Sequence, residues 1–101
     1  MPKKQINIED LKGITNNKSF RIICDNANER IVLLTMLIKA GIRWHGEGYW
    51  TTAIQIEEAY PWREFDTVDI DPYNHYMQGN RSRYMSKGMI HFKQFMEVIN
   101  E

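Results

Sequence analysis

The sequence holds little cysteine, proline or glycine, and no excess of either charge. Cys24 is the single cysteine among 101 residues, so neither an internal disulfide nor a zinc site made of cysteines can form. Thirteen basic and thirteen acidic residues leave a formal net charge of zero. This balance removes the simplest argument for a nucleic-acid-binding protein, an overall basic surface. The lack of cysteine favours a protein of a reducing compartment.

Long hydrophobic runs are also absent. The apolar segment 32–42 has the length of a core helix and is too short for a membrane span. Residues 1–13 lack the apolar core of a signal peptide. Apolar residues make up 43% of the chain, an ordinary value for a globular domain. We therefore expect one cytoplasmic domain over residues 1–101 with no membrane contact, in which the polar residues 1–19 could form a loosely ordered N-terminal segment.

A central helix is predicted over residues 26–41. Asn26 followed by Glu29 has the spacing of a capping box, and Gly41 suits the residue that follows a helix end. Between them, apolar residues recur at helical spacing on one face: Leu33, Met36, Leu37 and Ala40. A second apolar face contains Ile31, Leu34 and Ile38. This helix needs cover on more than one side, from its own chain or from a second copy, and we predict a homodimer.

The remaining elements complete an α+β pattern. Alternating apolar residues predict strands over 20–25, over 63–71 and at the start of 42–50. Residues 51–60 suit a strand or a short helix capped by Thr52 and Gln55, and we favour the helix. Residues 73–80 have the composition of a loop, 81–85 could form a further strand, and 92–99 suit an amphipathic helix. We expect a small single α+β domain whose antiparallel or mixed sheet is packed by the central and C-terminal helices.

Aromatic rings gather directly after the central helix: Trp44, Tyr49, Trp50, Tyr60 and Trp62. Ile42 and Trp44 share one strand face, so we expect Trp44 in the core. Tyr49 and Trp50 follow a Gly-x-Gly turn and are hard to bury together. One of them should lie near the surface, either at the rim of the core or as an anchor for a protein or a nucleotide base.

Acidic residues follow the rings within 15 positions: Glu57, Glu58, Glu64, Asp66, Asp69 and Asp71. If they share one surface with Tyr60 and Trp62, they could engage a basic groove on another protein. A soluble strand edge protected by carboxylates is the simpler explanation of these residues. We name as candidate binding residues Tyr49, Trp50, Tyr60, Trp62, Glu64, Asp66, Arg81 and Arg83.

Two other groups could carry chemistry. Arg81 and Arg83 share a face if extended, and with a ring such as Trp50 they would suit a nucleotide. Asp69, Asp71 and His75 form an oxygen-rich group that could bind a divalent cation. If His45 lay close to them, the group could form the active site of a small metal-dependent hydrolase. Its spacing matches no metal motif, and the chain shows neither a nucleophile elbow nor a glycine-rich phosphate loop. We expect no catalytic residue, no metal and no cofactor.

Residues 20–70 carry a strand, a capped helix, Leu-x-x-x-Gly-x-x-Trp with a glycine turn, and Tyr-Pro before another strand. The residues of this pattern are Leu37, Gly41, Trp44, Gly46, Tyr60 and Pro61, with Phe92 and Phe95 closing the chain. The pattern resembles that of small uncharacterised bacteriophage accessory proteins. The resemblance implies a protein made in a bacterial host that binds host or defence components, and it supplies no catalytic residues. We expect a non-enzymatic binder of a host protein, with a nucleotide-sequestering protein or a metal-dependent hydrolase as alternatives.

Overall fold

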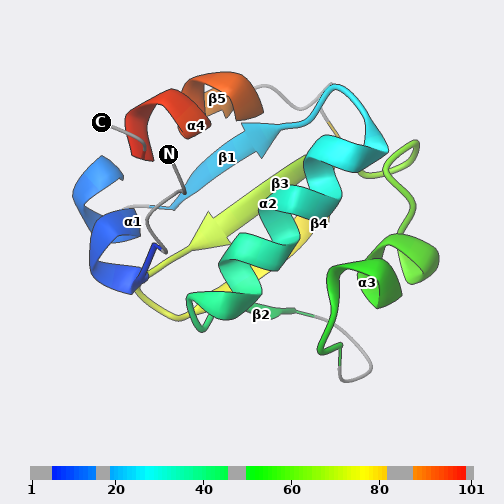
Figure 1. Cartoon of the computed structure of the whole chain (residues 1–101), viewed down its shortest axis with the longest axis horizontal. Helices are drawn as coiled ribbons and strands as arrows, with labels where there is room; N and C mark the ends of the chain where they lie inside the picture. The colour runs from blue at the N-terminus through cyan, green and yellow to red at the C-terminus, as the bar shows by residue number, and fades with distance from the viewer. Residues whose placement is uncertain (1–5, 16–18, 46–49, 82–87, 100–101) are drawn as a thin grey trace.

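The computed structural model describes residues 6–15, 19–45, 50–81 and 88–99. Within these ranges the chain forms four helices and five strands (Figure 1). In chain order they are α1 (Ile8–Thr15), β1 (Phe20–Ile23), α2 (Ala27–Lys39), β2 (Arg43–Trp44), α3 (Ala53–Ala59), β3 (Thr67–Asp71), β4 (Tyr76–Asn80), β5 (Met89–His91) and α4 (Phe92–Ile99).

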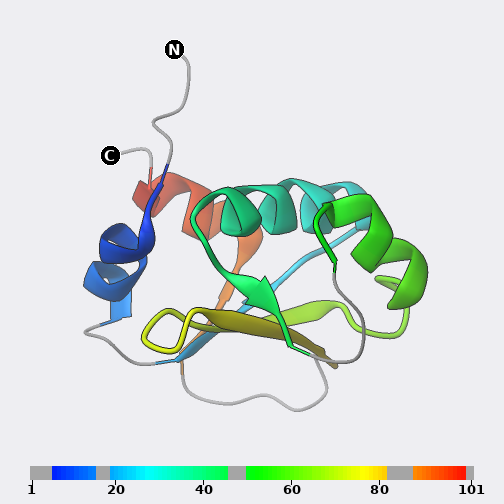
Figure 2. The ribbon, with the colours of Figure 1, turned by 90° about the horizontal axis from the view of Figure 1, so that it is seen from below.

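The strands form one mixed sheet in the order β2-β4-β3-β1-β5. β3 runs antiparallel to both β1 and β4, whereas the edge strands β5 and β2 run parallel to their neighbours. Figure 2 shows α2, α3 and α4 on one face of this sheet. The fully buried Ile22, Ile70 and Met77 belong to one core cluster with the leucines of α2. The predicted α+β fold is confirmed, and the sheet is of the mixed kind.

Both ends of α2 follow the local signals of the sequence. The Asn26 side chain accepts the Glu29 N–H at 2.8 Å, as predicted, whereas the Glu29 carboxylate accepts the Asp25 N–H at 2.9 Å and not the Asn26 N–H that a full capping box requires. At the other end, the Ile42 N–H donates to the Leu37 carbonyl at 2.9 Å. Gly41 has a φ of 96°, which its missing side chain permits. This pair of features is a Schellman ending, so the predicted boundaries are confirmed.

The buried face of α2 differs from the predicted one. Its buried residues are Arg30, Leu33, Leu34 and Leu37, again at helical spacing but starting from an arginine. Met36 and Ala40, which we placed on the core face, are only partly buried. Of the large apolar side chains on α2, Val32 is exposed, whereas Ile31, Met36 and Ile38 pack partly buried against the core. Most of the apolar circumference of α2 is thus covered within the single chain.

The two shorter predicted helices are confirmed. Thr52 and Gln55 bond each other's backbone N–H groups in a capping box at the start of α3. α3 then ends at Ala59, shortly before Pro61. In α4, Phe95 and Met96 are buried, as the spacing of the apolar residues predicted.

Two segments differ from what their composition suggested. The predicted loop 73–80 is wrong over its second half, because residues 76–80 form β4 and pair with β3 from Asp71↔Tyr76 to Thr67↔Asn80. The predicted strand 81–85 falls mostly outside the described residues. Residues 8–15 of the polar N-terminal segment form α1, in which Leu11 is fully buried. None of the described helices is long and apolar enough to cross a membrane.

Candidate functional site

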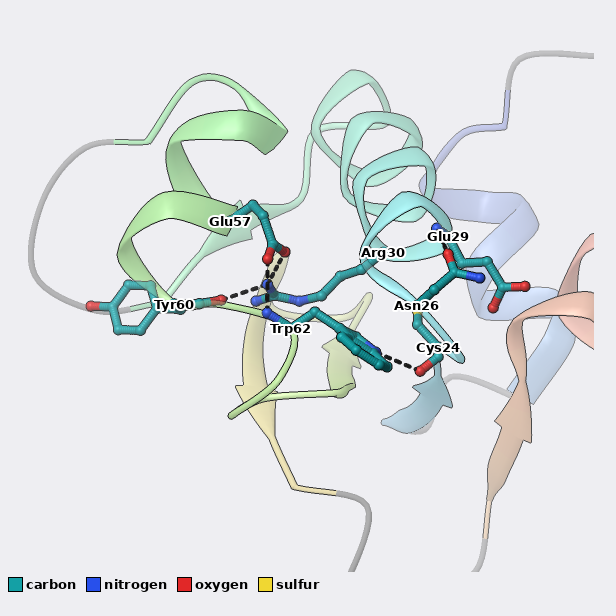
Figure 3. A network of polar contacts seen from close by, with 7 residues as sticks. All are labelled: Cys24, Asn26, Glu29, Arg30, Glu57, Tyr60 and Trp62. Carbon is teal, nitrogen blue, oxygen red and sulfur yellow. Dashed lines mark hydrogen bonds and ion pairs between the residues drawn. The ribbon is translucent and has the colours of Figure 1, made fainter.

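A buried arginine lies where α2, α3 and the end of β1 meet (Figure 3). Arg30 is fully buried, and its Nη1 contacts the Glu57 carboxylate at 2.6 Å and the Tyr60 carbonyl at 2.5 Å. Its Nε and Nη2 have no hydrogen-bond partner among the described residues. Burial lowers the pKa of Arg30, and the hydrogen bond and charge of Glu57 oppose that effect. The guanidinium also lies 5.5 Å from the centre of the Trp44 ring.

The same network holds the chain that follows α3. The second oxygen of Glu57 accepts the Trp62 N–H at 2.8 Å, and the Trp62 indole donates to the Cys24 carbonyl at 2.7 Å (Figure 3). Burial, followed by the charge of Glu29, raises the pKa of the Cys24 thiol to about 12. An uncharged, buried thiol is a poor nucleophile. This network therefore fixes α3 to β1 and offers no reactive group.

The predicted aromatic anchors are used mainly inside the fold. The Tyr60 ring lies among Trp44, Trp50 and Phe65, with ring centres 5.3 to 6.4 Å apart. Trp62 is partly buried and bonded to Cys24, as described above. Tyr49 lies outside the described residues. Among the predicted rings, Trp50 has a buried polar atom, its Nε1, that finds no partner among the described residues.

The acidic residues do not act as one group. Glu57 is paired with Arg30, and Asp69 lies 2.7 Å from the Arg21 Nε on the opposite face of the sheet. Asp66 is partly buried and its carbonyl accepts the Cys24 N–H, whereas Glu64 is exposed. The expected single acidic patch is therefore divided, and several of its members are already paired.

The Asp-rich turn is explained by its own hydrogen bonds. Asp71 accepts the backbone N–H groups of Tyr73 and Asn74 and the Asn74 side-chain amide. Burial would raise the pKa of Asp71, but these bonds and the charge of His75 lower it. The neighbouring His75 has a φ of 61°. Among the described residues, no three His, Cys, Asp or Glu side chains come together as a metal site.

A groove of about 470 Å³ lies beside Trp50, at the β2 edge of the sheet. This volume is within the range of small-ligand sites, about 300–1,000 Å³. Its walls come from the end of α2, from β2 and from the two residues 50–51 that precede α3. The described residues that line it are Ile38, Gly41, Ile42, Arg43, Trp44, Trp50 and Thr51.

The groove brings an aromatic wall and a cation together. Trp44 and Trp50 supply indole surfaces, and the exposed Arg43 supplies a guanidinium. Arg81, predicted for a nucleotide phosphate, is exposed but does not line this groove, and Arg83 lies outside the described residues. Arg43 was missed because strand alternation marks it only as an outward residue. Its position at a sheet edge follows from the pairing of β2 with β4.

A second groove, of about 260 Å³, lies over β1, β3 and β4. Its polar lining includes Arg21, Asp69, Asp71, Tyr76 and Gln78. The arginine and the first aspartate are paired with each other, and Asp71 caps its own turn. Its charged groups are therefore already engaged within the chain, whereas Arg43 in the groove beside Trp50 forms no ion pair with another described residue.

A search of protein-family models, of curated proteins and of solved structures returned no match. The resemblance to bacteriophage accessory proteins therefore stays a prediction.

Proposed function

We propose that this chain is a non-enzymatic, phage-type accessory protein that binds a protein in the cytoplasm of a bacterial host and inhibits or modulates it. The groove beside Trp50 supports this proposal, because it combines apolar surface from Ile38, Ile42 and two indoles with the exposed Arg43, and the buried Trp50 N–H has no partner among the described residues. A buried donor without a partner costs free energy, and an acceptor from another molecule would remove that cost if binding shifts the side chains that cover the donor. Protein-binding sites are enriched in tryptophan and arginine, and this groove contains both.

The test is affinity capture from bacterial lysate with three forms of the protein, followed by mass spectrometry. The wild type and Tyr73→Ala should retain the same host protein, whereas Trp50→Ala should lose it. Tyr73 is a matched control because its ring is 67% exposed and lies in the β3–β4 turn. Circular dichroism must show that each variant is folded. Equal capture by all three forms, or no specific capture by the wild type, would contradict the proposal.

A nucleotide-binding protein is the second candidate, and Arg43 beside two indoles favours it. A ring for the base and a cation for the phosphate are the minimal features of such a site. A nucleotide at a hundredfold excess over Kd should stabilise the fold by about 2.7 kcal/mol. Melting temperatures measured with each common nucleotide test this candidate, and an unchanged melting temperature throughout would exclude it.

A further inference from the structure

We propose that the partner contributes an extended, acidic segment that pairs with the free edge of β2 and inserts an apolar side chain into the groove beside Trp50. This inference rests on the proposed function and names the chemistry of the partner. Pairing of a peptide with an exposed sheet edge is a common mode of recognition, in which main-chain bonds and side-chain pockets act together.

The hydrogen bonds of β2 leave one residue directed outward. β2 is an edge strand of the sheet, and its neighbour is β4. The N–H groups of Arg43 and His45 donate to the His75 and Met77 carbonyls of the β4 side, at 3.0 and 2.6 Å. In a parallel ladder the residue between two bonded residues directs its N–H and C=O away from the neighbouring strand. Trp44 holds that position, so among the described residues its backbone has no strand partner on the outer side and is available to an added strand.

The groove follows the same edge. All the residues of β2 line it, together with Ile42 before the strand and Trp50 across from it. A strand added beside Trp44 would direct alternate side chains toward opposite faces of the sheet. One of these would enter the space between the end of α2 and Trp50. Ile38, Ile42 and the two indoles contribute apolar surface there beside polar groups, which suits a leucine, a methionine or an aromatic residue.

The charges at the rim favour an acidic segment. Arg43 lines the groove, is exposed, and forms no ion pair with another described residue. No aspartate or glutamate is among the described residues that line the groove. The unused Trp50 Nε1 is a donor and has no acceptor of its own among the described residues. A carboxylate next to the apolar side chain would neutralise Arg43, and it would bond the indole N–H after binding shifts the side chains that cover that atom.

The test begins with a displayed library of random heptapeptides selected on the wild-type protein. The enriched peptides should carry an Asp or Glu within two positions of a bulky apolar residue. Kd, measured by fluorescence anisotropy on a synthetic peptide, should rise about tenfold in Trp50→Phe and in Arg43→Gln. Tyr73→Ala should leave Kd unchanged. Among the described residues the indole N–H has no partner, so Trp50→Phe breaks no described hydrogen bond of the free protein.

Hydrogen exchange separates this inference from the proposed function. Binding of the peptide should slow exchange of the Trp44 backbone N–H about tenfold or more, whereas the Arg43 and His45 N–H groups are already bonded to the β4 side. Unchanged exchange at Trp44, or peptides that bind Trp50→Phe and Arg43→Gln as tightly as the wild type, would overturn it. If a host protein were still captured through Trp50 in that case, the proposed function would stand and the strand-pairing inference would fail.

Discussion

Arg30 is a fully buried charged residue that links α2 to α3 through Glu57. The guanidinium can be fully buried because its Nη1 donates hydrogen bonds to the Glu57 carboxylate and the Tyr60 carbonyl. The Trp44 ring lies beside it. A buried ion pair adds little net stability over an apolar pair, but removal of one partner leaves a charge uncompensated. The contact between α2 and α3 therefore depends on both members of the pair.

Substitution of Glu57 should destabilise the fold far more than substitution of its neighbour. Glu57→Gln removes the charge that compensates Arg30, and we expect a loss of about 3 kcal/mol, the low end for a broken buried pair because Glu57 is 20% exposed. Glu58→Gln, at an exposed position of the same helix, should change stability by less than about 0.5 kcal/mol. Urea unfolding measures both. Equal, small losses would show that the pair does not hold α3 in place.

Cys24 should react only when the protein unfolds. With a pKa of about 12, only about one Cys24 thiol in ten thousand is ionised at pH 8 in the folded protein. A disulfide reagent at pH 8 should label the native protein slowly and the urea-unfolded protein at once. Rapid labelling of the native protein would contradict the buried position of this thiol.

The raised pKa of Cys24 also sets a pH dependence of stability. The thiol ionises near 9.0 in the unfolded chain and near 12 in the folded one. The folded state thus holds this proton more tightly, and its contribution is complete below pH 9 and lost as the pH rises toward 12. Cys24→Ala should reduce the slope of stability against pH in that interval.

At the scale of elements, the sequence predicted the helix caps but did not predict that β4 pairs with β3. The side chains of Asn26 and Thr52 each accept the backbone N–H of the residue three positions later. A helix cap can therefore be predicted from a short stretch of sequence. β4 contains glycine and asparagine, which strands disfavour, and it is held by pairing with β3. That pairing was not visible in the composition of 73–80.

The helical spacing that predicts burial includes Arg30, but an arginine is not expected in a core because it is charged. Arg30, Leu33, Leu34 and Leu37 follow helical spacing, so the true core stripe of α2 begins with an arginine. The partner of Arg30, Glu57, lies 27 residues away on another helix. The groove beside Trp50 depends on the edge position of β2, which follows from the whole sheet. Local patterns therefore predicted the rings but not the cavity that two of them line.

Gly79 in β4 should resist substitution because two side chains approach its backbone. A Cβ at this position would lie 3.0 Å from both the Phe65 Cβ and the Trp44 Cη2. We expect Gly79→Ala to cost about 1–3 kcal/mol by overpacking. Gly13→Ala in α1 is the matched control, since nothing lies within 4 Å, and it should stabilise the protein by up to about 1 kcal/mol. Urea unfolding measures both variants, and a neutral Gly79→Ala would contradict the described packing of β4 under Trp44.

At the scale of the whole molecule, self-association remains a prediction. We predicted a homodimer because α2 has two apolar faces, yet the chain itself covers most of them, and Val32 is the large apolar side chain of α2 that stays exposed. Sedimentation velocity at micromolar concentration decides between the two states. A homodimer gives twice the mass of the 12.1 kDa chain, whereas a single species at the chain mass would contradict the prediction.

The account as a whole depends on the groove beside Trp50 being the place where another molecule binds. The most direct measurement is a ¹H–¹⁵N spectrum of the tryptophan indole groups during titration with the captured host protein or with the selected heptapeptide. We predict that the Trp50 indole resonance moves downfield as its N–H gains an acceptor, while that of Trp62, already bonded to the Cys24 carbonyl, stays in place. A saturated complex in which the Trp50 resonance has not moved would contradict the account.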